Sequence, residues 1–381
     1  MKLASVIIGV LGIILTIKPF IRSANWFIRI GDFPRVQVLI TLILSLFLLA
    51  PAFEFAGYFD TVFTVLVSVC IFYQVQTILP FTPLYRKQVQ PARKEHDYEA
   101  SVSLLIFNVL MENENYDCAL RMIEASDADV VLLAEPDENW ARSLAPLHTK
   151  YPHTASCPLD NRYGMILFSR LPLEDTELQF LIQDDIPSIH TQVVLACGRS
   201  IALHGVHPRP PIPGENTRSI ERDGELLLVG KAISKSNLPC IVAGDLNDVA
   251  WSRTTQLFKR ISGLLDPRVG RGFYNTFHAH YPFLRIPLDH VFHSHHFRLV
   301  RLERVPDSCG SDHFPVFVKL SLEKDAPVEQ PKPAADKEED REALETVATA
   351  LKENRYRKLP FRRLREKIKK LLHKVSRRKR N

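Results

Sequence analysis

The first 85 residues contain three long apolar runs that themselves carry almost no charge. The runs cover Leu3–Ile17, Val36–Phe55 and Thr61–Leu79, and each is close to the length that crosses the hydrocarbon of a bilayer. The second and third runs have no polar face to present to water, which disfavours helices buried in a soluble core. The pattern predicts a membrane segment at residues 1–85 with about three transmembrane helices.

The first of these runs leaves an alternative open. Lys18 follows after only about 15 apolar residues, and Lys2 precedes them, as in the core of a signal peptide. No convincing small-residue cleavage site follows the run. The sequence therefore predicts two or three spans.

The central stretch, residues 100–323, has the composition of an ordinary globular domain. Its short apolar runs have the length of strands, and its periodicity alone predicts a mixed α/β domain. Residues 86–99 are predicted to be a linker between the membrane segment and this domain. Residues 324–381 are predicted to form a second linker and a basic amphipathic tail.

Two helical patterns occur in the C-terminal region. Lys337–Lys352 is highly charged and carries Leu344, Val347 and Leu351 on one stripe. Phe361–Lys379 repeats apolar residues at helical spacing, with cations on the opposite face. That pattern suits a helix lying on anionic lipid, and it also suits a solvated basic tail or a nucleic-acid-binding arm.

The formal net charge of +6 conceals two oppositely charged regions. Residues 355–380 contain 14 Lys and Arg and one Glu, whereas residues 101–323 contain 21 Lys and Arg and 27 Asp and Glu. Duplex DNA is normally bound by a basic surface, so the acidic central domain argues against it, although the tail could supply such a surface.

Cysteines and flanking charges bear on the cellular compartment. The six cysteines show neither a disulfide framework nor zinc-like spacing, which favours a reducing compartment. With three spans, the basic loop Lys18–Arg35 lies on the same side as the central domain. The positive-inside rule then predicts a multi-pass protein of the cell membrane with this domain in the cytoplasm, and loss of the first span reverses the prediction.

Polar side chains recur where apolar runs of the central domain end. One such residue is typical of a turn, but six in order, rich in hard oxygen ligands, predict a common polar site. Four runs end at Asn108, Glu135, His207 and Asp245, and the other two positions are Leu288-Asp289-His290 and Ser311-Asp312-His313.

This ordered set resembles the endonuclease/exonuclease/phosphatase superfamily, in a membrane-anchored, bacterial-type form. The most specific elements are Gly244-Asp245-Leu246-Asn247 and Ser311-Asp312-His313-Phe314-Pro315, and Tyr163 to Arg170 resembles a further strand of the family. The resemblance covers residues 100–323. It implies a four-layer α/β/β/α sandwich, with two mixed sheets face to face and helices outside.

The resemblance also implies a role for each residue of the set. Glu135 would be the principal Mg²⁺ ligand, with Asn108 beside it, and Asp312 would complete the metal shell directly or through water. An oxygen-only site of this kind suits Mg²⁺ or Mn²⁺. Asp245 would orient or deprotonate the attacking water. The remaining residues would contact the phosphoryl group or orient one that does: Asn247, His207, His313 and Asp289.

Four further residues lie close to these motifs in sequence. Arg218, Arg222, Trp251 and Arg271 are candidates for binding substrate, and bracing of loops is an equally good explanation. The turn after Asn247 lacks the Arg that phosphoinositide phosphatases usually show there, which disfavours a phosphoinositide substrate.

The sequence thus predicts a metal-dependent hydrolase of phosphodiesters or phosphomonoesters at the bilayer. Its expected partners are a phosphoester substrate, either a lipid head group or a nucleic acid, and the lipid bilayer. A nuclease acting on DNA or RNA is the alternative enzyme. A catalytically inactive membrane scaffold that binds anionic lipid or nucleic acid is the alternative of another class.

Overall fold

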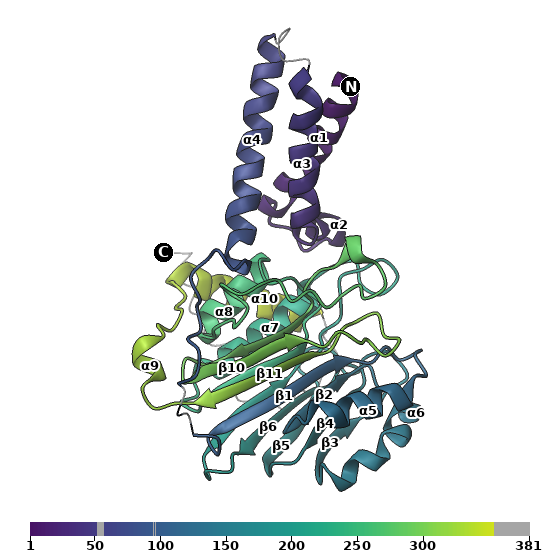
Figure 1. The fold of residues 1–381 in the computed structure, drawn as a ribbon, viewed down its shortest axis with the longest axis vertical. Helices are drawn as coiled ribbons and strands as arrows, with labels where there is room; N and C mark the ends of the chain where they lie inside the picture. The colour runs from purple at the N-terminus through teal and green to yellow at the C-terminus, as the bar shows by residue number, and fades with distance from the viewer. Residues whose placement is uncertain (52–56, 94, 96, 354–381) are drawn as a thin grey trace.

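A bundle of three apolar helices stands on one end of an α/β domain in the computed structural model (Figure 1), which describes residues 1–51, 57–93, 95 and 97–353. The helices are α1 (Lys2–Ile17), α3 (Arg35–Leu49) and α4 (Tyr58–Ile78). All three predicted apolar runs are helical over their described parts, and residues 52–55 of the second run lie outside the described residues.

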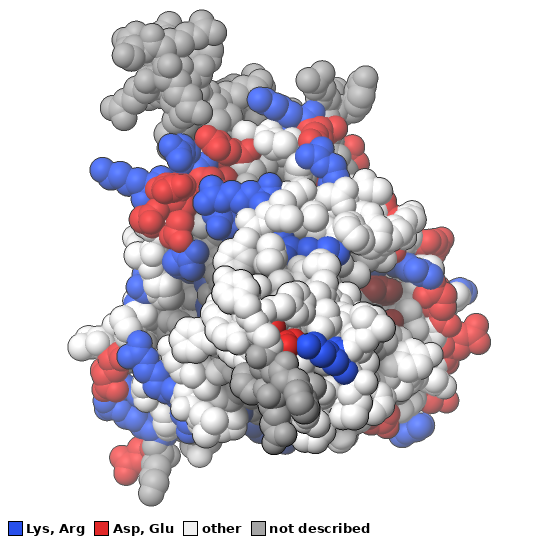
Figure 2. Space-filling view, turned by 90° about the horizontal axis from the view of Figure 1, so that it is seen from above, with Lys and Arg blue, Asp and Glu red and all other residues white. Residues whose placement is uncertain are grey.

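Two of these helical stretches, Lys2–Phe20 and Tyr58–Phe81, are long and apolar enough to cross a membrane. The third helix, α3, follows Trp26–Asp32 at a bend of 74°, and by length and composition this pair could cross a membrane only if the two helices count as one span. Apolar side chains cover the outside of the bundle, including Phe47 (73% exposed) and Phe72 (65% exposed). In Figure 2, uncharged side chains occupy most of the centre of the view and surround a small patch of acidic and basic side chains.

Several polar side chains inside the bundle are paired with one another. The Ser5 hydroxyl donates to the Ser45 carbonyl oxygen (2.7 Å), and the Ser45 hydroxyl donates back to the Ser5 carbonyl (2.8 Å). Gln74 Nε2 donates to Thr16 Oγ1 over 2.9 Å. Such pairing is required where water is absent, since an unpaired polar group would be costly.

Short helical turns join the bundle to the domain. They are η1 (Lys18–Phe20), α2 (Trp26–Arg29), η2 (Ile30–Asp32) and η4 (Leu79–Phe81). The Trp26 amide donates to the Thr217 carbonyl (3.0 Å), and Arg29 Nη2 lies 3.0 Å from Asp223 Oδ2. The segment around α2 is therefore held against the domain by backbone and side-chain bonds.

The domain contains two β-sheets, which confirms the prediction of a mixed α/β fold. Helices separate some strands, whereas β3 to β7 and β9 to β11 follow one another without a helix between them. The order in the larger sheet is β10-β11-β1-β2-β4-β3, with β1 and β2 parallel. Its strands are β1 (Ser101–Asn108), β2 (Val130–Ala134), β3 (His153–Cys157), β4 (Met165–Ser169), β10 (Phe297–Arg304) and β11 (Val316–Leu322).

The smaller sheet has the order β5-β6-β7-β8-β9, with β7 and β8 parallel and β9 antiparallel to β8. Its register places Asp245 directly opposite Asp289. The strands are β5 (Leu173–Gln179), β6 (Ser188–Val194), β7 (Ser200–Gly205), β8 (Cys240–Asp245) and β9 (Asp289–His293).

Buried side chains from both sheets form one hydrophobic cluster, in which Leu104 and Leu132 of the larger sheet join Leu203 and Ile241 of the smaller. The opposite faces are covered by helices, so central strands such as β1 are buried on both sides and read as continuous apolar runs. The covering helices are α5 (Tyr116–Ser126) and α6 (Glu138–Ser143) on the larger sheet, with the 3₁₀ turn η5 (Ala145–Thr149) following α6, and α7 (Ile220–Ile233), α8 (Arg253–Ser262) and α10 (Lys337–Glu353) on the smaller.

Both predicted linkers contact the domain. Ala92 N donates to the Leu299 carbonyl (2.8 Å), and Gln330, just after α9 (Ala326–Glu329), donates its Nε2 to the Phe297 carbonyl (2.8 Å). The predicted helix Lys337–Lys352 corresponds to α10, and its Val347 is buried against the domain. The predicted basic helix Phe361–Lys379 lies outside the described residues.

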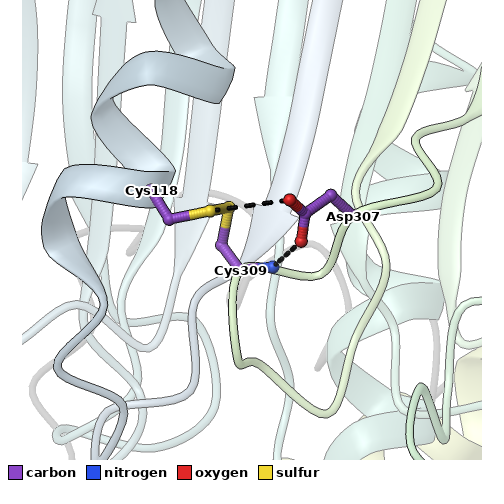
Figure 3. A group of neighbouring side chains, drawn as sticks. All are labelled: Cys118, Asp307 and Cys309. Carbon is purple, nitrogen blue, oxygen red and sulfur yellow. Dashed lines mark hydrogen bonds between the residues drawn. A yellow bond between two sulfur atoms is a disulfide. The ribbon is translucent and has the colours of Figure 1, made fainter.

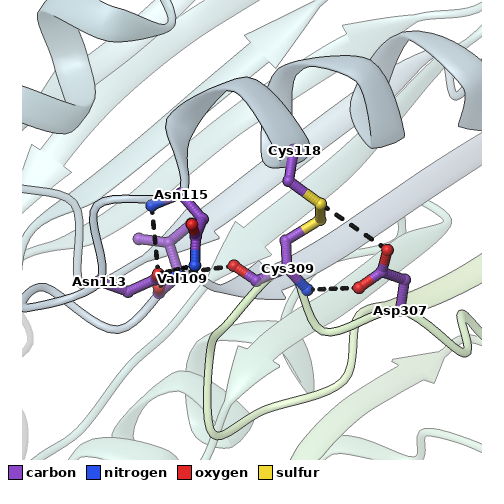
Figure 4. The surroundings of a disulfide bond; sticks show 6 residues. All are labelled: Val109, Asn113, Asn115, Cys118, Asp307 and Cys309. Atoms are coloured by element: carbon purple, nitrogen blue, oxygen red, sulfur yellow. Dashed lines mark hydrogen bonds between the residues drawn. A yellow bond between two sulfur atoms is a disulfide. The ribbon is translucent and has the colours of Figure 1, made fainter.

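Cys118 of α5 and Cys309 form a disulfide, although the cysteine spacing in the sequence showed no disulfide framework and favoured a reducing compartment (Figure 3). Their Cα atoms are 5.5 Å apart although 191 residues separate them in sequence, and the spacing along the chain gave no sign of the pair. Asn113 Nδ2 donates to the Cys309 carbonyl over 3.1 Å, beside the bridge (Figure 4). The disulfide therefore ties α5 to the loop that leads into Ser311-Asp312-His313.

Removal of this disulfide is expected to lower the stability of the protein. Replacing Cys118 and Cys309 together by Ser should cost about 2–4 kcal/mol, because the bridge closes a long loop in the unfolded chain, and should lower Tm by about 5–15 °C. Differential scanning fluorimetry measures this, with Cys157→Ser, at a free cysteine, as control. An equal Tm for the double variant and the control would contradict a stabilising bridge.

Two histidines of β9, His290 and His293, are expected to make the folded protein less stable at acidic pH. Both are almost completely buried, and burial lowers the pKa of His290 to about 3 and that of His293 to about 4. An unfolded histidine binds its proton near a pKa of about 6.5. The stability conferred by each neutral imidazole is therefore complete above that pH and declines by about 1.4 kcal/mol per pH unit on acidification.

The corresponding test compares Tm at about pH 7.5 and about pH 5. His293→Gln, which cannot bind a proton, should reduce the loss of Tm between the two values by about 4–8 °C, equivalent to about 2 kcal/mol. His280→Gln, at an exposed histidine, is the control. The same loss of Tm in both variants would show that His293 does not carry this dependence.

Candidate active site

The predicted polar residues meet at one edge of the two sheets. Parallel strands β1 and β2 end beside each other at Asn108 and Glu135, and parallel β7 and β8 end near His207 and at Asp245. Strands β9 and β11 run in the opposite direction. The N-terminal ends of these two strands therefore place Asp289 and the Asp312-His313 pair at the same edge. The topology thus brings together all six polar positions.

The backbone at this edge adopts conformations that ordinary residues avoid. Glu135 has φ 65° and Asn247 has φ 51°, both in the left-handed region. Gly244 precedes Asp245 with φ 139°, and a Cβ there would collide with the Val206 carbonyl oxygen. Strained conformations of this kind persist where surrounding structure imposes them, commonly at functional sites.

Asn108 joins the two sheets at the centre of the site. Its Nδ2 donates to Glu135 Oε1 (2.7 Å) and to Asp245 Oδ2 (3.1 Å), while its Oδ1 accepts from the Leu110 amide (3.0 Å). Asp245 Oδ1 in turn accepts from the Asn247 amide over 2.9 Å. One amide side chain therefore fixes both carboxylates relative to each other.

Two imidazoles flank these carboxylates. His313 Nδ1 lies 2.7 Å from Asp289 Oδ2, and its Nε2 lies 3.6 Å from Asp245 Oδ2. His207 Nε2 lies 3.8 Å from Glu135 Oε1, and its Nδ1 is 3.2 Å from the Asp245 carbonyl oxygen. Asp245 thus has an imidazole on each side.

These neighbours set the charge states of the groups. Burial alone would raise the pKa of Asp245, but the nearby His313 and His207 outweigh it and hold that pKa below its ordinary value. Burial alone would lower the pKa of His313, but Asp289 and Asp245 outweigh it and raise the pKa to about 10. At neutral pH, Asp245 is therefore an anion and His313 a cation.

The donor set fits a divalent metal. Glu135 is a largely buried carboxylate without an Arg or Lys partner among the described residues, and burial raises its pKa. Ligand atoms of Glu135, His207 and Asp245 lie within 4.8 Å of one another. Hard carboxylate oxygens in such proximity suit Mg²⁺ or Mn²⁺. Asp312 lines the same cavity but does not belong to this group of ligand atoms.

The site opens into a cavity of about 650 Å³. Glu135, His207, Asp245, Asn247 and His313 lie on its wall, together with Asp312. The buried pair partner Asp289 lies behind His313, outside the lining. A small substrate can therefore reach the carboxylates and imidazoles directly, whereas Asp289 acts only through His313.

The four residues predicted to bind substrate do not line this cavity. Arg218 is paired with Glu353 (2.7 Å), and Trp251 Nε1 donates to the Asp32 carbonyl (2.6 Å) next to the helical bundle. Arg271 Nη2 donates to the Val89 carbonyl over 2.6 Å. The contacts of these three side chains hold loops and the segment before the domain in place.

The fourth residue, Arg222, is buried behind the Asp245–Asn247 turn. Its Nη1 donates to the Asn247 carbonyl (2.6 Å), and its Nη2 lies 2.9 Å from Asp223 Oδ1 and 3.4 Å from Asp248 Oδ2. Arg222 therefore neutralises two buried carboxylates and supports the turn that presents Asn247.

Replacement of Arg222 should consequently affect stability. Arg222→Met leaves Asp223 and Asp248 with less positive charge in a buried setting and should cost about 3–5 kcal/mol. Arg218→Met removes only a partly exposed pair and should cost less than about 1 kcal/mol. Thermal denaturation of both variants checks this, and a raised KM with unchanged Tm for Arg222→Met would instead indicate contact with substrate.

Sequence reasoning did not single out several residues of the cavity wall. Arg162 lies on the wall and pairs with Glu112, and Tyr163 donates its hydroxyl hydrogen to Glu215. Their position just before Gly164, in the strand resembling the family, was the available signal. Trp26 and Phe33 come from the N-terminal segment, and nothing in the sequence pattern linked that segment to the site.

The fold and the site define an α/β protein in which two sheets bring carboxylate, amide and imidazole groups together at their adjoining strand ends. The sequence model of the protein family described as "Endonuclease/Exonuclease/phosphatase family" matches residues 105–313, more than half of the chain. The chain belongs to this family, whose members hydrolyse phosphoester bonds. A comparison with curated proteins gave no match.

Several solved structures are similar to this chain. An endonuclease/exonuclease/phosphatase from Beutenbergia cavernae is 18% identical, with a TM-score of 0.48, over 59% of this chain and 72% of that one. D. rerio TDP2 complexed with a single-strand DNA product is 17% identical, with a TM-score of 0.48, over 58% and 99%. The catalytic domain of human Nocturnin with a bound sulfate anion is 18% identical, with a TM-score of 0.48, over 61% and 100%.

Proposed function

We propose that this chain is a membrane-anchored, bacterial-type phosphoesterase that uses a divalent metal, with a four-layer α/β/β/α sandwich as its catalytic domain. The observation that carries the proposal is the convergence of Glu135, Asp245 and His313 on one cavity wall. Asp245 Oδ2, the proposed acceptor of the water proton, lies 3.6 Å from His313 Nε2, the proposed hydrogen-bond donor to the phosphoryl group. Membership of the family supports the phosphoesterase activity, and the long apolar helices support the membrane anchor.

In the proposed reaction, water attacks phosphorus while the bond to the leaving oxygen breaks on the opposite side. Asp245 is suited to orient the water and take its proton, because its pKa is held low. His313, charged by Asp289, donates to a phosphoryl oxygen and stabilises the negative charge that develops there. His207 and the side-chain amide of Asn247 supply further donors on the same wall, and Asn247 Nδ2 also donates to the Pro208 carbonyl (3.0 Å).

Glu135 would hold the metal, with Asn108 and Asp312 beside it. A bound Mg²⁺ or Mn²⁺ would supply positive charge next to the phosphoryl oxygens. The protein holds the Glu135 carboxylate in place for such a cation, because Asn108 Nδ2 donates a hydrogen bond to it and its surroundings largely bury it. The intact set of carboxylates and imidazoles argues against the inactive-scaffold alternative.

The proposal is tested on the full chain in lipid nanodiscs with bis(p-nitrophenyl) phosphate as substrate. We expect release of p-nitrophenolate that requires Mg²⁺ or Mn²⁺ and ceases with EDTA. Glu135→Gln should abolish both hydrolysis and metal binding measured by calorimetry, whereas the exposed-site control Glu124→Gln should retain both. Absence of metal binding and of hydrolysis in the unmutated protein would refute the enzyme and favour a scaffold.

The side of the membrane remains a prediction. Basic residues flanking the helices favour a cytoplasmic domain, whereas the Cys118–Cys309 disulfide favours an oxidising compartment. Maleimide labelling of freshly broken cells distinguishes the two. A cytoplasmic domain would label at Cys118 and Cys309 without reductant, and a domain on the oxidising side would label there only after reduction.

A further inference from the structure

The wall of the active-site cavity is mostly apolar. Apart from the catalytic edge, the cavity is bounded largely by hydrophobic and proline side chains from three parts of the chain. Besides His313, the cationic side chains of the described lining are Arg29 and Arg162, and both arginines are paired, with Asp223 and Glu112 respectively. The apolar lining comprises Trp26, Ile30, Phe33, Pro34, Leu110, Pro210, Pro211, Ile212, Pro213, Phe277, Leu284, Ile286 and Leu288.

One side of this wall belongs to the segment that joins the helical bundle to the domain. Trp26, Ile30, Phe33 and Pro34 come from α2, η2 and the turn before α3, and Figure 1 shows α2 between the bundle and the domain. Gln37 Nε2 of α3 donates to the Phe283 carbonyl over 2.8 Å, which ties this segment to the loop on the other side. The cavity therefore lies where apolar helices and catalytic edge meet.

Several side chains of the lining are also exposed to solvent. Ile30 is 47%, Ile212 44% and Leu284 60% exposed, and the neighbouring Phe283 is 87% exposed. Large hydrophobic side chains around an opening are typical of sites that bind an apolar partner. Their continuity with the apolar helices indicates that this partner comes from the bilayer.

We infer that the substrate is an amphiphilic phosphoester, whose phosphate group lies at Glu135 and Asp245 and whose hydrocarbon chain occupies the apolar part of the cavity. This inference rests on the proposed function. A hydrocarbon chain gains free energy by leaving water for such a wall, in proportion to the area buried. A nucleic-acid strand would instead place a row of charged phosphates against apolar side chains, while both arginines of the lining are already paired with carboxylates.

The test uses alkyl p-nitrophenyl phosphates with methyl, octyl or dodecyl chains and the full protein in phosphatidylcholine nanodiscs with Mg²⁺. All the esters have the same leaving group, so a difference between them reports on the chain. We expect kcat/KM for the octyl ester to exceed that for the methyl ester by at least about 30-fold, since one buried methylene contributes up to about fourfold.

A cavity variant separates binding by the protein from partition into the bilayer. Combined Ile30→Gln, Ile212→Gln and Leu284→Gln, at positions already partly exposed, should lower the octyl-to-methyl ratio by about tenfold. The control combines Leu178→Gln and Leu238→Gln, which are exposed to a similar degree outside the cavity, and should keep the ratio. Partition of the esters into the nanodisc is the same for both variants.

Each other result has a defined meaning. Hydrolysis of the methyl ester with no preference for longer chains, or an unchanged ratio in the cavity variant, would overturn the inference and leave the proposed function standing. Faster cleavage of a single-stranded oligonucleotide than of any alkyl ester would overturn the inference in favour of a nuclease. A lack of metal-dependent hydrolysis of every ester would overturn both proposals.

Discussion

Asp245→Asn is expected to lower kcat by about 10²–10⁴-fold while leaving the fold intact. The carboxylate lies between two imidazoles and accepts hydrogen bonds from Asn108 and the Asn247 amide, which keep it ionised. An asparagine has the same shape but cannot take a proton from water. The loss should therefore appear in kcat rather than in Tm.

Hydroxide provides a check specific to this role. If Asp245 deprotonates the attacking water, the deficit of Asp245→Asn should shrink as pH rises, because hydroxide replaces the missing base. Asp175→Asn, at an exposed carboxylate of β5, is the matched control and should behave as the unmutated protein. A rate within about tenfold of the unmutated protein would exclude Asp245 as the base.

The second large effect is expected for Asp289→Asn, with a fall in kcat of about 10²–10³-fold and little change in KM. Asp289 lies behind His313 and contacts the substrate only through it, with 2.7 Å between Oδ2 and Nδ1. The carboxylate orients the imidazole and, with Asp245, raises the pKa of His313. Without it the ring is less often charged, so stabilisation of the phosphoryl oxygen is lost.

Asp266 offers a control of matched burial for this positioning residue. Asp266 is fully buried and paired with Arg268 over 2.8 Å, but it lies outside the active-site cavity. Asp266→Asn should lower Tm, because it leaves a buried guanidinium without its anion at a cost of about 3–5 kcal/mol, and should change kcat little. Asp289→Asn should show the opposite pattern. A large loss of Tm with normal kcat for Asp289→Asn would reduce its role to structure.

The mixed α/β domain and the apolar helices could be predicted because each follows from local pattern. A strand buried on both faces is continuously apolar, as in β1 and β2, and a lipid-sized helix has a long run without charge. The basic helix predicted for Phe361–Lys379 and the number of spans remain predictions.

The polar residues of the site could also be found in sequence, because a strand end in this topology is a fixed place in space. Asn108, Glu135, Asp245 and His313 each adjoin a strand, so their order along the chain was sufficient to expect a common edge. Arg222 and Trp251 were predicted to bind substrate because they are close to the motif in sequence, but neither lines the cavity. Both are within a few residues of the motif, but their side chains point to buried partners behind the turn.

The sequence by itself determined the class of fold, the family and the chemical character of the site, because these depend on residue type and on order along strands. Only the tertiary structure decided which distant residues meet. The Cys118–Cys309 bridge spans 191 residues, and Trp26 and Phe33 reach the cavity from a segment that precedes the domain. Such contacts form when complete helices, strands and loops pack against one another. The hydrophobic periodicity of each segment reports only its own secondary structure and not its distant partner.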